Sequence, residues 1–159
     1  MNFFRKNSAA DSDKAANGEI SDDIYKNICE LSEIGDSHSE KKEYSKAIKQ
    51  YHKAFDLIPE PFEDYKASTW LLTATGDTYF LAQDYTNTLH ALEEAMYCPE
   101  AVGNPFIHLR LGQALFELSN FDKAKDELAR AYLGGGQEIF EGENPKYYEY
   151  LKTFMRNIE

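Results

Sequence analysis

The chain has 159 residues, of which 42% are hydrophobic and 14% aromatic, and this suits one domain or a short repeat array with a buried core. The formal net charge is -11. Its sign argues against nucleic acid and anionic membranes as partners, because sequence-independent nucleic-acid binding needs a cationic surface. A basic partner would instead be attracted.

Residues 1–20 are rich in Ser, Ala, Asn and Asp and carry three basic and three acidic side chains. They offer little apolar area to offset the entropy of ordering, so we expect a disordered N-terminal tail. Docking of Phe3 and Phe4 onto the rest of the chain is the alternative. No apolar run has the length of a signal peptide or a membrane span, and Cys29 and Cys98 fit no metal or disulfide pattern. We therefore expect a reducing, cytoplasmic location.

The next segments predict three helix pairs separated by breakers. The expected helices are residues 22–42, 45–58, 65–82, 86–98, 104–118 and 121–133. The stretches PEPFED (59–64) and PEAVGNP (99–105) separate the pairs, and Asn104 is expected to cap the fifth helix before a proline. Gly134–Gly136 ends the sixth helix. A phosphate-binding loop is the alternative for these glycines, but no Lys-Ser or Lys-Thr follows them.

The last segment, ENPKYYEYLKTFMRNIE, predicts a seventh helix over about residues 144–157. Asn144 is expected to cap it and Pro145 to open it. Its apolar side chains fall on one face at spacings of four, three and four residues: Tyr147, Leu151, Phe154 and Ile158. An open stack of helices leaves its last pair exposed, so we expect a capping helix. A helix that binds a partner is the alternative.

A glycine, an aromatic residue, a small residue and an alanine recur three times in one register. The aromatic residue follows the glycine by 9 positions, the small residue by 12 and the alanine by 19. The copies are Gly35-Tyr44-Ala47-Ala54, Gly76-Tyr85-Thr88-Ala95 and Gly112-Phe121-Ala124-Ala131. We interpret each copy as two antiparallel helices that approach closely at the glycine. Larger side chains at the small positions would overpack the pair, at about 1–3 kcal/mol each.

This pattern resembles the tetratricopeptide repeat (TPR), a unit of about 34 residues with the form W-x2-L-G-x2-Y, A-x3-F, A and P. The copies here follow it from Leu31 to Pro59 and around Gly76 and Gly112, although the third ends in glycines instead of proline. The resemblance implies an all-α fold, a right-handed α-α superhelix (TPR solenoid) of about three helix pairs plus the capping helix. It would form a single domain over residues 21–159, with repeats at about 28–61, 69–102 and 105–138.

Members of this family generally bind proteins or peptides in a concave groove lined by the first helix of each pair. Carrying these positions over gives ten candidate partner-binding residues: Asp36, Glu40, Trp70, Thr73, Asp77, Phe80, Phe106, Gln113, Phe116 and Glu117. Carboxylates pair with Arg or Lys and aromatic rings are favoured anchors, so a basic or amphipathic protein segment is the expected ligand. Alternatively, the rings pack between helices and the acids are solvated.

Two functional classes are disfavoured. Members that bind chaperone tails hold a C-terminal carboxylate in a clamp of Lys, Asn and Arg, but the matching positions here are Ser32, Asp36, Thr73 and Asp77. The four histidines form no HExxH or close pair, GxSxG is absent, and no carboxylate pair is singled out as a general acid and base. We therefore expect no catalytic, metal or cofactor site. A buried His–carboxylate cluster would reopen the question of catalysis.

The leading functional hypothesis is a non-catalytic protein-interaction module. Its small size and acidic charge are similar to those of bacterial immunity or chaperone-type partners that occupy a basic toxin or secreted protein, an analogy from fold and charge. The alternative is a structural subunit that self-associates through its open ends or its C-terminal helix. The identity of the partner and the oligomeric state stay open at this point.

Overall fold

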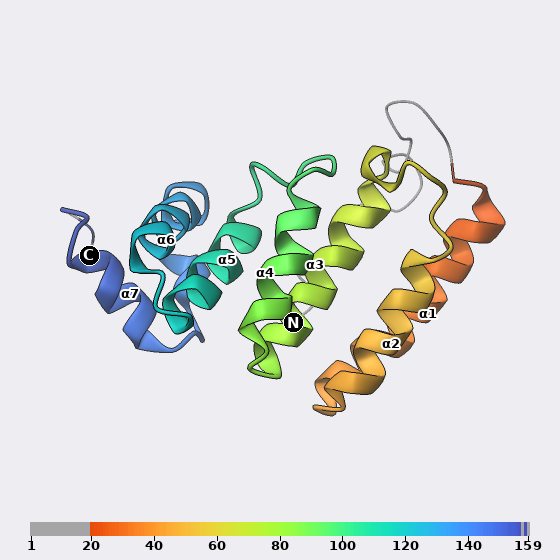
Figure 1. Cartoon of the computed structure of the whole chain (residues 1–159), viewed down its shortest axis with the longest axis horizontal. Coiled ribbons are helices and arrows are strands. Elements are labelled where there is room, and N and C mark those ends of the chain that lie inside the picture. The colour runs from red at the N-terminus through yellow and green to blue at the C-terminus, as the bar shows by residue number, and fades with distance from the viewer. Residues whose placement is uncertain (1–19, 157, 159) are drawn as a thin grey trace.

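The computed structural model describes residues 20–156 and 158, and every regular element in that part is a helix. Figure 1 shows helix pairs following one another along the long axis, from α1 at one end to α7 at the other. The main helices are α1 (Asp22–Glu40), α2 (Tyr44–Phe55), α3 (Lys66–Leu81), α4 (Tyr85–Ala95), α5 (Pro105–Glu117), α6 (Phe121–Gly135) and α7 (Pro145–Lys152). Two 3-10 helices, η1 (Phe62–Asp64) and η2 (Gln137–Phe140), lie in connections. The predicted all-α fold of three pairs and a final helix is confirmed.

The turns inside the three pairs share one geometry. Each first helix ends with a residue in the left-handed conformation: Lys42 (φ 59°), Gln83 (φ 62°) and Ser119 (φ 61°). In the second pair, the Gln83 N–H donates to the Phe80 carbonyl and the Asp84 N–H donates to the Tyr79 carbonyl, both at 2.9 Å. These two bonds form a Schellman motif, which satisfies carbonyls of the last helical turn. The chain therefore reverses within three residues, although no glycine supplies the left-handed position.

The close approach predicted at the repeat glycines is confirmed. The glycines and their neighbours on the second helix are Gly35–Tyr51, Gly76–Leu92 and Gly112–Leu128. A Cβ placed on Gly76 would lie 2.7 Å from both Cγ and Cδ2 of Leu92. A Cβ on Gly112 would lie 2.7 Å from Cγ of Leu128 and 2.9 Å from its backbone nitrogen. The small residues of the pattern are all fully buried: Ala47, Ala54, Thr88, Ala95, Ala124 and Ala131.

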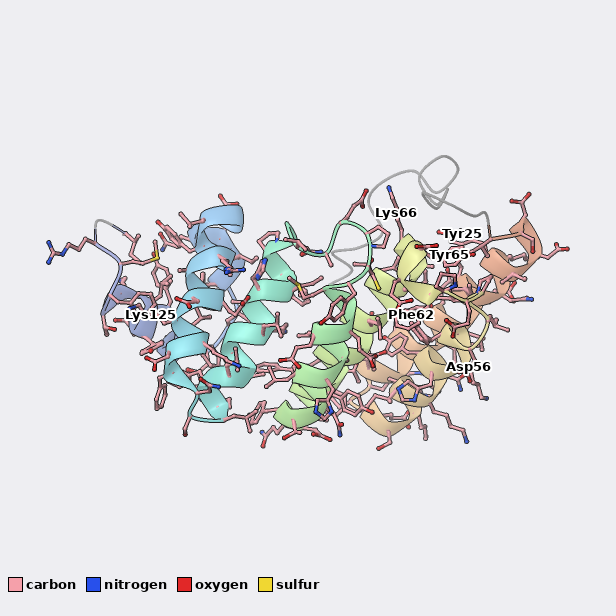
Figure 2. The ribbon with its side chains drawn as sticks, turned by 45° about the horizontal axis from the view of Figure 1, so that its top comes forward. Tyr25, Asp56, Phe62, Tyr65, Lys66 and Lys125 are labelled. Carbon is pink, nitrogen blue, oxygen red and sulfur yellow. The ribbon has the colours of Figure 1, made fainter. Side chains whose placement is uncertain are left out.

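Three clusters of buried side chains run along the stack, and each is shared between neighbouring helix pairs. The first joins α1 and α2 to α3, and includes Tyr25, Phe62 and Tyr65 near the starts of α1 and α3 (Figure 2). The last joins α5 and α6 to η2 and α7, with Tyr147 and Leu151 buried in it. No helix within residues 20–156 and 158 combines the length and apolar character that crossing a bilayer requires.

Several predicted helix termini need correction. The second and fourth helices end at Phe55 and Ala95 rather than at residues 58 and 98. Gly134 and Gly135 lie within the last turn of α6, and only Gly136, with φ of 64°, terminates the helix. The seventh helix ends at Lys152 rather than near residue 157, although its predicted cap and opening proline are confirmed, since the Asn144 side chain accepts from the Lys146 N–H at 3.1 Å.

Ile20, which we assigned to the tail, is buried in the first core cluster. It directly precedes the N-cap Ser21, the position from which an apolar side chain commonly packs onto the first turns of a helix. The folded part therefore begins at or before residue 20. The disorder expected of residues 1–19 lies outside the residues that the structure describes.

Candidate functional site

The candidate residues occupy matching rows on the first helix of each pair. Counted from the repeat glycine, the rows lie six and three residues before it and one, four and five residues after it. Such spacings put side chains on one side of an α-helix. We call the side of α1, α3 and α5 that carries these rows the A-face. The sequence pattern predicts this shared side, whereas neighbouring helices determine how much of it stays accessible.

Two of the candidate residues are buried by the packing of neighbouring helices. Thr73 and Gln113 are 0% exposed. The Thr73 hydroxyl donates to the Thr69 carbonyl at 2.6 Å, and the Gln113 amide donates to Glu143 Oε2 at 2.9 Å. Contrary to our expectation, neither side chain is available to a partner in this structure. Ser32, in the same row as Thr73, is also buried and donates to the Ile28 carbonyl.

Asp77 belongs to a buried ionic network that we did not predict. Arg110 on α5 is 6% exposed and donates through Nε to Asp77 Oδ1 at 2.5 Å. Its Nη1 donates to Gln113 Oε1 at 2.6 Å and to Glu143 Oε2 at 2.7 Å. Burial alone lowers the pKa of Arg110, but the charges of Asp77 and Glu143 outweigh it and raise that pKa. The Asp77 carboxylate is thus used to hold a buried cation.

Phe80 and Phe106 enclose the same guanidinium group. Its central carbon lies 4.7 Å from the centre of the Phe80 ring and 5.0 Å from the centre of the Phe106 ring. A cation over aromatic faces is stabilised by about 0.5–2 kcal/mol. These half-buried rings therefore belong to the A-face and also stabilise the Arg110 guanidinium group. One signal in the sequence pointed to this site, because Arg110 is the only Lys, Arg, Asp or Glu between Pro105 and Glu117.

Helix α7 covers the part of the A-face that belongs to the third pair. The Phe116 ring lies 5.6 Å from Tyr147 and 5.2 Å from Tyr150, measured between ring centroids. Glu117 accepts from the Tyr147 hydroxyl and pairs with Lys146, both at 2.5 Å. Burial raises the pKa of Glu117, but the hydrogen bonds from Lys146 and Tyr147 outweigh it and lower that pKa. The predicted capping role of α7 is confirmed by this packing.

The remaining candidates lie on α1 and α3. Asp36 is half-buried and accepts from the Tyr51 hydroxyl at 2.7 Å, while Glu40 is exposed in the last turn of α1. Burial and the hydrogen bond to Asp36 raise the pKa of Tyr51. Trp70 is half-buried and packs against the first core cluster. We call Asp36, Glu40 and Trp70 the α1–α3 section of the A-face.

His108 and Glu127 form a buried His–carboxylate pair within the described part of the chain. His108 is buried, and its Nδ1 lies 2.5 Å from Glu127 Oε2 while its Nε2 lies 2.7 Å from the Val102 carbonyl oxygen. Both partners are acceptors, so both ring nitrogens donate. The hydrogen bond to Glu127 raises the pKa of His108, which fits a protonated ring. This pair ties α5 to α6 and to the α4–α5 loop, and it leaves neither ring nitrogen for a substrate.

No cluster of three or more His, Cys, Asp or Glu side chains suited to a metal ion occurs among the described residues. Burial raises the pKa of the Cys98 thiol to about 11, which keeps it protonated and a poor nucleophile near neutral pH.

Solved structures resemble most of the chain. The TPR domain of OM64 from Arabidopsis matches with a TM-score of 0.63 and 16% identity, over 82% of this chain and 95% of that domain. The N-terminal domain of stress-induced protein-1 from C. elegans matches with a TM-score of 0.63 and 17% identity, over 83% of this chain and all of that chain (100%). The fold is a TPR solenoid.

A third TPR domain was solved with a ligand. The first TPR of Spaghetti (RPAP3), bound to the HSP90 peptide SRMEEVD, matches with a TM-score of 0.61 and 21% identity, over 80% of this chain and 90% of that one. Comparison with protein-family models and with curated proteins gives no match. The likeness therefore concerns the TPR fold alone.

Proposed function

We propose that this TPR solenoid is a non-catalytic protein-interaction module that binds a basic, aromatic-containing segment of another protein at the α1–α3 section of its A-face. The observation that carries the proposal is that Asp36, Glu40 and Trp70 lie on the A-face of α1 and α3, whereas α7 packs into the cluster of the third pair. Asp36 contributes one carboxylate to this surface, and it accepts a hydrogen bond from the Tyr51 hydroxyl at 2.7 Å. A Trp ring adds a platform for apolar or cationic side chains.

An acidic peptide such as SRMEEVD, the ligand of the RPAP3 domain, fits this surface poorly. Arg110 is the buried cation of the A-face, and two carboxylates already neutralise it. Ser32 and Thr73, at positions of the carboxylate clamp, carry no charge and are buried. The net charge of -11 further repels an acidic ligand and attracts a basic one.

The test uses a fluorescently labelled peptide rich in Lys and Phe and a matched peptide with Glu in place of each Lys. We expect the full chain to bind the first and not the second. Glu40→Lys should weaken binding about tenfold, which corresponds to about 1.4 kcal/mol. Glu93→Lys on α4 makes the same charge change on an exposed residue of a second helix and is the matched control. If both variants weaken binding equally, binding depends on the net charge of the chain, and the A-face is not the binding site.

Glu40 is preferred to Asp77 for this experiment because reversing the charge of Asp77 would place a second cation beside buried Arg110.

We further propose that the partner is a basic toxin or a secreted protein, and that this chain binds it as an immunity or chaperone-type protein. This more specific proposal is supported by the acidic charge and the small size of the chain.

Self-association is the second candidate function, and one observation favours it. Tyr97, Val102 and Leu133 are 80%, 65% and 77% exposed, near the C-terminal ends of α4 and α6 and in the loop that follows α4. Exposed apolar side chains mark an interaction site where they gather in one patch, and this candidate function requires these three to do so. Light scattering after size-exclusion chromatography over a wide range of protein concentration distinguishes the candidates. A monomer throughout supports the interaction module, and a stable dimer lost in Leu133→Glu supports self-association.

A further inference from the structure

The first turn of α7 shows how the A-face holds a segment that is both basic and aromatic. Lys146 Nζ and the Tyr147 hydroxyl each lie 2.5 Å from Oε1 of Glu117. The Lys146 ammonium group also lies 5.8 Å from the centre of the Phe116 ring, and the Tyr147 ring packs edge-on against the same ring. Two consecutive side chains of α7 therefore converge on one carboxylate and one aromatic ring of α5.

The first helix pair carries the same carboxylate at the same repeat position. Glu40 follows Gly35 by five residues, as Glu117 follows Gly112. Glu40 is exposed, and within the described part of the chain it makes no hydrogen bond or ion pair. The matching position of the second pair holds Leu81, which is 42% exposed and offers an apolar surface in the same row. The α1–α3 section thus repeats the chemistry to which α7 binds on the third pair.

We propose that the partner presents a Lys followed directly by a Tyr at the start of a helix, and that Glu40 binds this pair as Glu117 binds the first turn of α7. The ammonium group and the phenol hydroxyl both donate to the carboxylate, and hydrogen bonds to an ionised acceptor are stronger than neutral ones. The inference rests on the proposed function, because it specifies the motif that the same section of the A-face recognises.

One part of the α7 segment has no matching site on α1 or α3. Glu143, three residues before Lys146, accepts from Arg110 Nη1 at 2.7 Å. Arg110 stands two residues before the repeat glycine, and the matching positions are Glu33 on α1 and Ala74 on α3. Neither residue is a cation that could hold an acidic side chain. The motif of the partner therefore has a neutral or basic residue three positions before its Lys.

The third pair is not open to a competing segment. Tyr147 and Leu151 of α7 are 4% and 0% exposed, so the helix is anchored by its apolar side as well as by its first turn. A segment in the same chain also reaches an effective concentration on the order of 1 mM at its site. A free segment with the chemistry of α7 is thus directed to Glu40.

The probe is a fluorescently labelled peptide with the sequence of residues 144–152, NPKYYEYLK, which retains the Asn cap and the proline that begin α7. Its binding to the full chain is measured by fluorescence anisotropy. We expect Lys146→Met in the peptide to weaken binding about tenfold and Tyr147→Phe about threefold. Extending the peptide by Glu143 should weaken binding about threefold, whereas extending it by Gln should leave the affinity unchanged.

A double-mutant cycle between peptide and protein locates the contact. In the chain variant Glu40→Gln, we expect Lys146→Met in the peptide to change the affinity by less than about twofold, because its partner is gone. Glu30→Gln removes the same charge from an exposed position of α1 outside the A-face rows and is the matched control. There the loss caused by Lys146→Met should stay about tenfold. A tenfold loss that persists in Glu40→Gln would overturn the inference.

The Lys- and Phe-rich peptide separates this inference from the function on which it rests. If that peptide binds in a manner that depends on Glu40, while the peptide of residues 144–152 does not bind or shows no coupling to Glu40, the motif is overturned and the proposed function stands. If neither peptide binds the full chain, the proposed function is overturned and the inference with it.

Discussion

The repeat glycines allow a quantitative test of how the helix pairs hold together. Gly76→Ala and Gly112→Ala each introduce a Cβ at 2.7 Å from a leucine side chain. Ordinary van der Waals contact begins near 3.4 Å, so each pair has to open by about 0.7 Å or its leucine has to move. A gap of 0.5–1 Å forfeits about a quarter to a half of a dispersion contact. Overpacking costs about 1–3 kcal/mol, against about 1 kcal/mol gained from alanine in a helix. We expect a net loss of up to about 2 kcal/mol, at the upper end for Gly112, where a backbone atom also lies in the way.

The two sites differ in a way that a double-mutant cycle can resolve. At Gly76, all three nearest atoms belong to the Leu92 side chain, so Leu92→Ala removes the obstruction. At Gly112, the Leu128 backbone nitrogen at 2.9 Å remains after Leu128→Ala. We therefore expect Gly76→Ala and Leu92→Ala to compensate each other by about 1–2 kcal/mol, and the third-pair substitutions to compensate less.

Urea unfolding followed by far-UV circular dichroism gives the free energies of unfolding from the midpoint and slope. Gly103→Ala is the control, because no atom lies within 4 Å of a Cβ at that position. Equal coupling in the two pairs would refute the role assigned to the backbone nitrogen. Stability of Gly112→Ala equal to that of the parent would refute the close-approach explanation itself.

Three further outcomes follow from the structure. Arg110→Met should lower the free energy of unfolding by about 3 kcal/mol, since it leaves two carboxylates with their buried partner removed; a loss below about 1 kcal/mol in urea unfolding would contradict the network. The pKa of His108 is raised in the fold by its hydrogen bond to Glu127, so its stabilising effect is complete below about pH 6.5 and is lost as the pH rises through the raised value. The stability difference between the parent and His108→Gln should therefore shrink as the pH rises above about 6.5, and a pH-independent difference would argue against a protonated ring. Gln83→Gly should raise the melting temperature by about 2–4 °C, because glycine relieves about 1 kcal/mol of left-handed strain, whereas Gln83→Ala keeps a Cβ and should give no gain.

The sequence was sufficient for the fold because the decisive contacts recur at fixed spacing. Each repeat glycine contacts a residue sixteen positions later, across one short turn. The same close contact between two helices therefore occurs three times along the chain. Asn104 and Asn144, each followed by proline, predicted two helix starts that the structure contains. The end of α7 at Lys152 could not be predicted from the sequence, because the apolar pattern of the helix continues beyond it to Ile158.

The candidate site was only partly predictable. Periodicity identifies the side of a helix, but it does not say how far a neighbouring helix covers that side. Thr73 and Gln113 share a side with Glu40 and Glu117 yet are fully buried. The contact of Arg110 with Glu143 spans 33 residues and depends on how the segment before α7 returns over α5. No local pattern in the sequence encodes that return.

The covering of α5 by α7 limits what this solenoid can recognise. Only two first helices keep an accessible A-face, and packed helices lie about 8–10 Å apart. A surface about 20 Å wide accommodates about six residues of extended chain, at about 3.3 Å per residue. The protein is therefore suited to reading a short linear motif, and a change of one or two residues in such a motif would be enough to gain or lose recognition.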